Sequence, residues 1–206
     1  MFKVFGCQRT GTTYLRELLK QNFGVEVLTN ELGWKHGEIS NPVPPLEKVK
    51  FKYGAERLLQ LQGLAGSCEV TAIVIIKNPY SWLQSIESYA ARAWPKPFGS
   101  VAEYFSFYNA RYAGHLEAIS AQKPLWCYKT AFFIRYEDLL TDLWGTLKHV
   151  ERLSGHHMKY CHDVEKVEQS HPLTVEKRKF YLAPPHRIDI EAEVDWKVIE
   201  RYGYSR

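Results

Sequence analysis

The sequence predicts an α/β fold with an open, mainly parallel sheet flanked by helices. Residues 70–76 carry β-branched side chains at nearly every position and show no polar alternation beyond Thr71, which is typical of a strand buried on both faces of a parallel sheet. Strand-like segments also alternate with helical ones along the chain, as in open α/β sheets. A chain of 206 residues can bury a sizeable core, so we expect one domain spanning residues 1–206.

The N-terminal segment has the order strand, glycine-containing loop, helix. Residues 3–7 form a short apolar run that stops at a Gln-Arg-Thr-Gly turn. The helix after the turn is expected from apolar residues at helical spacing, with Gly24 as its C-terminal cap. Residues 25–28 predict a second strand, and residues 53–64 a short helix. The residues that carry the helical spacing are Leu15, Leu18, Leu19 and Phe23.

The second half of the chain alternates in the same way. Residues 100–103 form a capping-box pattern that opens a long amphipathic helix reaching Ile119. Residues 131–134 predict another buried strand. The other helices are expected after Pro79, from Arg135 to near Ser154, and over residues 194–201 with a stop at Gly203.

Composition and charge exclude several classes of protein. The formal net charge of +4 is mildly basic, which favours an anionic ligand but lacks the dense basic stripe of a nucleic-acid-binding protein. There is no apolar run near 20 residues, so we expect no membrane span, and residues 1–6 do not suit a signal peptide. The cysteines show no paired spacing, which indicates reduced thiols and a cytoplasmic location: Cys7, Cys68, Cys127 and Cys161.

The first loop has the features of an anion site. It joins a buried strand to a helix N-terminus, where backbone N–H groups lack partners and the helix dipole is positive. Gly11 allows close approach of an anion, Arg9 adds a permanent cation, and Thr10, Thr12 and Thr13 offer hydroxyl donors. No Gly-Lys-Ser/Thr sequence is present, which argues against a standard P-loop ATPase or kinase.

A second loop follows the strand at residues 70–76. Lys77-Asn78-Pro79 ends this strand, and Pro79 is well placed to begin a helix. Ser85 lies about two turns along that helix and could face the same ligand as Lys77. Open parallel sheets bind ligands beyond the carboxyl ends of their strands, where both loops are expected.

These motifs together resemble the PAPS-dependent sulfotransferases, in particular small members of bacterial and phage type. The segment Gln8-Arg9-Thr10-Gly11-Thr12-Thr13-Tyr14 is similar to the family's 5′-phosphosulfate loop, with Gln8 where proline is usual. Lys77-Asn78-Pro79 with Ser85 is similar to its 3′-phosphate site, with lysine in place of arginine. Residues 134–140 resemble the family's strand-to-helix junction, and residues 195–204 the end of the bacterial and phage-type chains.

The resemblance implies a P-loop-like sulfotransferase fold and an activity. The donor would be 3′-phosphoadenosine-5′-phosphosulfate (PAPS), the product 3′,5′-adenosine bisphosphate, and the acceptor a hydroxyl or amine of a small molecule or carbohydrate, with no metal required. Arg9 would contact the bridging and leaving oxygens of the donor. Residues implied to bind the nucleotide are Arg9, Thr10, Gly11, Thr12, Thr13, Lys77, Ser85 and Arg178.

The acceptor hydroxyl needs a general base. His36 is one candidate, because a histidine titrates near neutrality and family members carry a lysine and a histidine close together in a comparable segment. Glu31 is the other, because some sulfotransferases use a glutamate in this region. Lys35 is expected to support the transferring sulfuryl group.

Two other functions stay open from the sequence. One is a nucleotide-dependent phosphotransferase with an aberrant phosphate loop. The other is a catalytically inert, nucleotide-binding module of sulfotransferase type, which the lysine at position 77 keeps open. We expect no metal site, because the spacing of His156, His157, Cys161 and His162 fits no closed zinc pattern.

Overall fold

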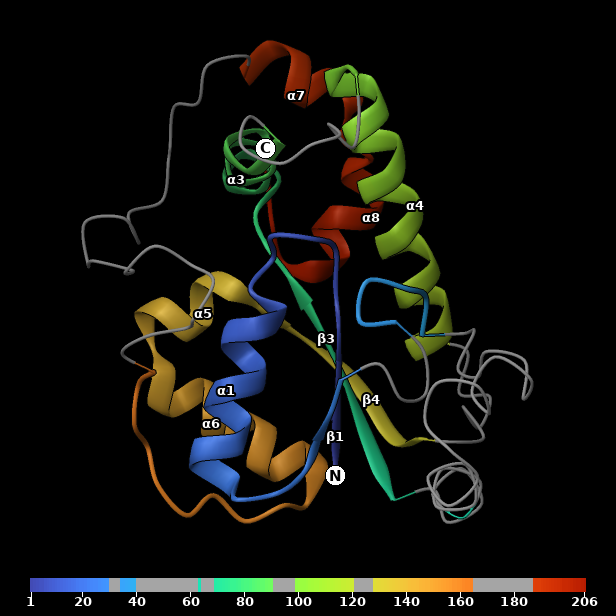
Figure 1. The fold of residues 1–206 in the computed structure, drawn as a ribbon. Helices are drawn as coiled ribbons and strands as arrows, with labels where there is room; N and C mark the ends of the chain where they lie inside the picture. Colours follow the sequence, from blue (N-terminus) through green and yellow to red (C-terminus); the bar gives the residue numbers. More distant parts are fainter. Residues whose placement is uncertain (30–33, 40–62, 64–68, 91–98, 121–127, 165–186) are drawn as a thin grey trace.

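The computed structural model describes residues 1–29, 34–39, 63, 69–90, 99–120, 128–164 and 187–206 (Figure 1). Its centre is a four-stranded sheet with the order β2-β1-β3-β4, in which every pair of neighbouring strands is parallel. The predicted open, parallel α/β sheet is therefore confirmed. The strands are β1 (Phe2–Phe5), β2 (Val27–Leu28), β3 (Val70–Ile76) and β4 (Tyr128–Arg135).

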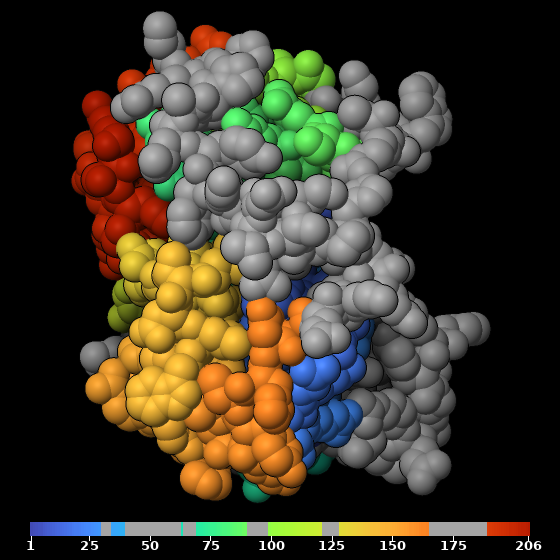
Figure 2. All heavy atoms as spheres, turned by 90° about the vertical axis from the view of Figure 1, so that its left-hand side faces the viewer, coloured from blue at the N-terminus to red at the C-terminus, as the bar shows by residue number. Residues whose placement is uncertain are grey.

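One face of the sheet is covered by α1 (Thr12–Phe23), α5 (Tyr136–Thr141) and α6 (Leu143–Ser154). Ile73 and Ile75 of β3 belong to the hydrophobic cluster on this face, which includes residues of α1 and α6. Figure 2 looks onto this layer, with the segment after α6 running beside α1. The amide of Asn22 ties the two together by donating to the His162 carbonyl oxygen at 2.9 Å.

The opposite face and the upper end of the sheet are covered by the remaining helices (Figure 1). Ala72, Val74 and Ile76 of β3 belong to the cluster on this side, so β3 is buried on both faces as its sequence predicts. The helices are α3 (Pro79–Ala90), α4 (Val101–Ser120), α7 (Arg187–Glu193) and α8 (Trp196–Ile199), which continues as the 3₁₀ turn η2 (Glu200–Tyr202).

Helix boundaries follow the expected caps in three places. The Glu103 N–H donates to Ser100 Oγ at 3.2 Å and so begins α4. Gly24 ends α1 with φ of 62°, and Gly203 follows η2 with φ of 83°; both values are in the left-handed region that glycine tolerates best.

The structure corrects two expected helices and adds a third that was not predicted. The single helix expected from Arg135 to Ser154 is two helices, because Asp142 interrupts it and caps α6 by accepting the Gly145 N–H at 2.9 Å. The expected C-terminal helix is shorter and turns into 3₁₀ structure, while α7 was not predicted. The helix expected at residues 53–64 lies almost wholly outside the described residues.

The strand order places the ligand crevice that is expected of an open α/β sheet between the carboxyl ends of β1 and β3. The chain leaves β1 through α1 and enters β2 on one side, whereas β3 pairs with the other side of β1. This reversal is the topological switch point at which open α/β sheets bind ligands. The loops that follow β1 and β3 therefore flank one site. No helix within the described ranges is long and apolar enough to cross a membrane.

Candidate functional site

The loop after β1 approaches β3 very closely. Gly6 has φ of 158°, and a Cβ at this position would lie 2.5 Å from the Ile75 carbonyl oxygen, so only glycine fits. Gly11 is the N-cap of α1, with φ of 93°, and no side chain in the described part of the chain caps this helix. Within the described ranges the N–H groups of the first turn of α1 therefore have no capping side chain, and a helix N-terminus of this kind is the arrangement that binds phosphate and sulfate groups.

The three threonines of the loop take different positions. Thr10 is fully buried and its hydroxyl donates to the Cys7 carbonyl oxygen at 2.7 Å, so it stabilises the loop and is not available as the expected ligand donor. Thr12 is nearly buried, while Thr13 is half-buried and its hydroxyl accepts from Lys35 Nζ at 3.3 Å. Of the three threonines, Thr13 is thus the best placed to contact a bound ligand together with Lys35.

Arg9 adopts a backbone conformation that is unusual for its residue type. Its φ is 67°, the one positive φ of a non-glycine residue in the described part of the chain. Its guanidinium carbon lies 5.2 Å from the centroid of the Tyr89 ring on α3. Arg9 therefore extends from the loop after β1 toward the helix that follows β3.

Three tyrosine hydroxyls fix the carboxyl end of β3. Each donates to one of three successive carbonyl oxygens, so that the backbone leading into the second loop is held from the α4 side. The bonds are Tyr112 to Ile75 at 3.0 Å, Tyr108 to Lys77 at 2.6 Å, and Tyr204 to Ile76 at 3.4 Å, the last being the longer branch of a hydroxyl that also donates to Glu137.

The side chain of Lys77 lies between the two loops. Its Nζ is 5.0 Å from the centroid of the Tyr136 ring, and this ring also packs against Gly11, where a Cβ would come within 2.5 Å of it. Burial lowers the pKa of Lys77 to about 8; the charge of Glu137 opposes this shift and the charge of Arg9 adds to it. Arg9 and Lys77 are therefore close enough to repel each other.

Glu137 supports the second loop in a way that the sequence did not reveal. Its carboxylate accepts the Asn78 N–H at 3.0 Å and the Tyr204 hydroxyl, and burial raises its pKa. Asn78 in turn caps α3, with its Oδ1 accepting the Tyr80 N–H at 3.0 Å. A signal did exist, because Glu137 is the second residue after β4, and the carboxyl ends of β3 and β4 lie side by side.

Ser85 lies on the face of α3 that is turned toward the first loop. It is three residues after Trp82, whose indole N–H donates to the Gln8 carbonyl oxygen at 2.8 Å, and four before Tyr89, which contacts Arg9. Residues three and four apart share a helix face. Half-buried Ser85 therefore lies between two side chains that contact the loop.

His36 has a defined tautomer. Its Nδ1 lies 2.8 Å from the Gly6 carbonyl oxygen, and because a carbonyl can only accept, Nδ1 carries the proton and Nε2 holds a lone pair. Burial lowers the pKa of His36 to about 4, so the ring is neutral at pH 7. This is the protonation state that a general base requires.

Lys35, the residue before His36, lies beside the beginning of α1. It lines a small pocket of about 10 Å³ together with the first turn of α1, including Thr12, Thr13 and Arg16. Burial, and then the charge of Arg16, lower its pKa. The backbone carbonyl of Lys35 accepts the Gly6 N–H at 3.0 Å, which fixes residues 35 and 36 against the end of β1.

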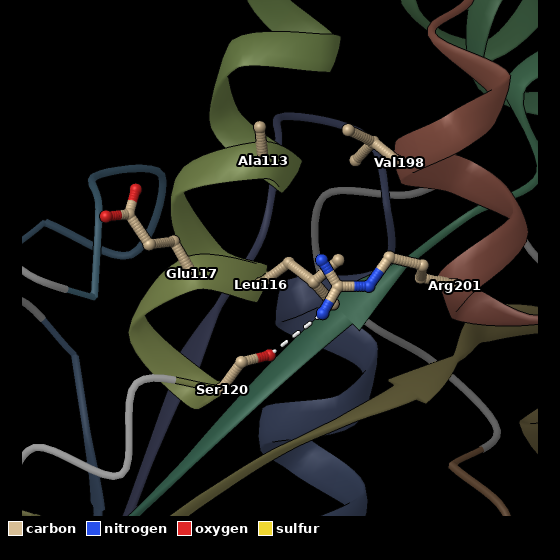
Figure 3. A pocket seen from close by; sticks show the side chains of 6 residues that line it. All are labelled: Ala113, Leu116, Glu117, Ser120, Val198 and Arg201. Carbon is tan, nitrogen blue, oxygen red and sulfur yellow. Dashed lines mark hydrogen bonds between the residues drawn. The ribbon is translucent and has the colours of Figure 1, made fainter.

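Two expected site residues, Glu31 and Arg178, lie outside the described residues. A larger pocket of about 330 Å³ lies elsewhere, between α4 and α8 (Figure 3). Arg201 reaches across it to Ser120 Oγ at 3.1 Å, while the carboxylate of Glu117 points away. No residue of either loop lines this pocket. Within the described ranges no group of three or more His, Cys, Asp or Glu side chains could hold a metal ion.

Residues from three segments therefore lie around the carboxyl ends of β1 and β3: Arg9 with the α1 N-terminus, Lys77 with Ser85, and Lys35 with His36. Comparison of the sequence with protein-family models and with curated proteins finds no match.

Proposed function

We propose that this protein is a sulfotransferase that moves a sulfuryl group from PAPS to a hydroxyl or amine of a small molecule or carbohydrate. One observation carries the proposal. Arg9 and Lys77, which follow two neighbouring strands, converge at the switch point of a parallel sheet. A nucleotide with a phosphate at each end can contact both cations, the 5′-phosphosulfate at Arg9 and α1 and the 3′-phosphate at Lys77 and Ser85.

Electrostatics support a doubly anionic ligand. Arg9 and Lys77 repel each other, and the positive end of the α1 dipole lies beside them. An anion bound between them relieves this repulsion and restores hydrogen bonds to the uncapped N–H groups of α1. Lysine at position 77 supplies a point charge where the resembling family has an arginine, and this still suits a phosphate.

The side chains also suit in-line sulfuryl transfer. The acceptor oxygen forms a bond to sulfur as the bond between sulfur and the bridging oxygen breaks, and the acceptor proton passes to Nε2 of His36. The leaving 5′-phosphate takes up negative charge, which Arg9 and the α1 N-terminus stabilise. Lys35, held next to Thr13, stabilises the oxygens of the sulfuryl group in transit.

A thermal-shift comparison tests this function against its alternatives. A ligand that binds only the folded protein raises the melting temperature, so 3′,5′-adenosine bisphosphate should stabilise the protein more than ATP with magnesium does. Sulfate transfer from labelled PAPS to a panel of acceptors should follow. Stabilisation by ATP alone would favour a phosphotransferase. Stabilisation by the bisphosphate without transfer to any acceptor would favour an inert module.

A further inference from the structure

Arg111 and His115 lie one turn apart on the side of α4 that faces the loop after β1. Arg111 forms an ion pair with Glu38, two residues after His36, with 3.4 Å between its Nη1 and Glu38 Oε1. The His115 ring lies 6.1 Å from the ring of Phe5 at the end of β1. This part of α4 therefore borders the His36 side of the crevice.

Both side chains bury polar atoms that lack partners. Nε of Arg111 and both ring nitrogens of His115 are buried with no hydrogen-bond partner in the described part of the chain, and His115 is completely buried. Buried polar groups normally have partners, so an unpaired set beside a crevice is unusual. The Glu38 side chain is half exposed and uses one end of the guanidinium group, which leaves further donors for a ligand.

The electrostatic surroundings favour an anion here. Burial is the main cause of the low pKa of His36, and the charges of Lys35 and Arg111 lower it further, so both cations act on the base. Arg111 also acts on the pKa values of Cys7 and His115, each of which is shifted mainly by burial. An acceptor whose hydroxyl lies at His36 would therefore meet a partly unsatisfied guanidinium next to it.

We propose that Arg111 binds an oxyanion carried by the acceptor, so that the preferred acceptors are hydroxyl compounds with a carboxylate or sulfate group, such as an acidic sugar. This inference rests on the proposed sulfotransferase function, because it takes His36 as the base. Glu38 is a competitor: it pairs with the same guanidinium and must release it when the acceptor binds. Arg111 is thus a residue that determines specificity.

Acceptor pairs in which one neutral group is replaced by a carboxylate test the inference: the C6 hydroxymethyl group in the two sugar pairs and a ring hydrogen in the phenol pair. Glucose with glucuronate, galactose with galacturonate, and phenol with 4-hydroxybenzoate are compared for sulfate transfer from PAPS. They are also compared for thermal shift in the presence of 3′,5′-adenosine bisphosphate. We expect the acidic member of at least one pair to be preferred. Arg111→Gln should raise KM for that member roughly 10- to 100-fold, the size expected for losing a hydrogen bond to a charged group, and leave its neutral partner nearly unchanged.

Glu38→Gln is a second variant. It should not disturb the fold, because the Glu38 side chain is half exposed. Removing the competing carboxylate should lower KM for the acidic member several-fold. Arg201→Gln, in the pocket between α4 and α8, is the matched control. It should leave KM unchanged for both the acidic and the neutral acceptor. A lack of acid preference in all three pairs, or a preference that survives Arg111→Gln, would overturn the inference while transfer itself upholds the proposed function. A different outcome is that 3′,5′-adenosine bisphosphate does not bind, while the acidic acceptors raise the melting temperature only when Arg111 is present. That outcome would overturn the proposed sulfotransferase function but support an anion site at Arg111.

Discussion

The indole N–H of Trp82 on α3 donates to the carbonyl oxygen of Gln8 at 2.8 Å. This bond joins the helix after β3 to the loop after β1, so the two halves of the crevice are held in a fixed relation. The bond also fixes Gln8, which precedes Arg9. The positive φ of Arg9 is strained and persists only when the surrounding structure holds it. Trp82 is completely buried, and the geometry of the cation at position 9 thus depends on the core.

Arg9 can be tested by two substitutions that separate charge from backbone strain. Arg9→Ala and Arg9→Gly both remove the guanidinium, so both should weaken binding of 3′,5′-adenosine bisphosphate and slow transfer by similar factors. Only glycine also removes the cost of the positive φ, which is about 1 kcal/mol for other residues. In urea unfolding the glycine variant should therefore be the more stable of the two. Equal stability, or unaltered kinetics in both, would contradict this account of the loop.

Lys77 should make donor binding sensitive to alkaline pH. Its pKa is lowered to about 8, so the charge that holds the 3′-phosphate is present below pH 8 and is lost as pH rises through that value. The phosphates of the ligand are already fully ionised above pH 7. The Kd of 3′,5′-adenosine bisphosphate should rise up to about tenfold per pH unit beyond pH 8. Lys77→Arg, which stays protonated, should abolish this loss; an identical pH profile in that variant would exclude Lys77 as the cause.

Glu137 should set the pH at which that loss begins. Its negative charge opposes the pKa drop of Lys77, so Glu137→Gln should lower the pKa further and move the alkaline loss of affinity to lower pH. The exposed Glu117 on α4 provides a control, since Glu117→Gln should leave the profile in place. The measurement is the bisphosphate Kd between pH 6 and 9.5. A profile that does not move in Glu137→Gln would show that this carboxylate does not act on Lys77.

His36 should affect turnover much more than donor binding. His36→Gln should lower kcat by about 10²- to 10⁴-fold, the usual contribution of a general base, and leave the bisphosphate Kd nearly unchanged. Because the pKa of His36 is about 4, the ring is already neutral at pH 6, and the wild-type rate should show no histidine titration between pH 6 and 8. Unchanged turnover in His36→Gln would move the base to Glu31.

The two buried histidines should destabilise the fold in acid. The pKa values of His36 and His115 are about 4 and about 3 in the folded protein, against 6.5 when exposed, so the unfolded chain binds more protons below pH 6.5. The free energy of unfolding should then fall as pH decreases from 6.5, by up to about 1.4 kcal/mol per pH unit for each histidine. His115→Leu should reduce this slope in urea unfolding series; an unchanged slope would contradict the burial of a neutral His115.

Much of the fold could be predicted because its signals are local. The unbroken β-branched run of β3 and the caps at Ser100 and Gly24 gave elements that the structure confirms. The break at Asp142 was missed because its neighbours keep a helical pattern, and only the hydrogen bond to Gly145 marks a new N-cap. Helix α7 is short, with little periodicity to detect.

Sequence reasoning could place Arg9 and Lys77 near one edge of the sheet, because the parallel strands β1 and β3 that precede them end at that edge. The inward hydroxyl of Thr10 and the support that Glu137 gives to Asn78 depend on tertiary hydrogen bonds between distant segments, which local sequence does not encode. The tautomer of His36 likewise follows from its contact with Gly6, 30 residues earlier in the chain.

The most direct measurement is calorimetric binding of three ligands, 3′,5′-adenosine bisphosphate, 5′-AMP and 3′-AMP, to the wild type, Arg9→Ala and Lys77→Ala. We expect the wild type to bind the bisphosphate about 10- to 100-fold more tightly than either monophosphate, as two charge-assisted contacts predict. Lys77→Ala should bind the bisphosphate no more tightly than 5′-AMP, and Arg9→Ala no more tightly than 3′-AMP. Equal affinities of the wild type for all three ligands, or equal losses for all three in both variants, would show that the two cations do not hold opposite ends of one nucleotide.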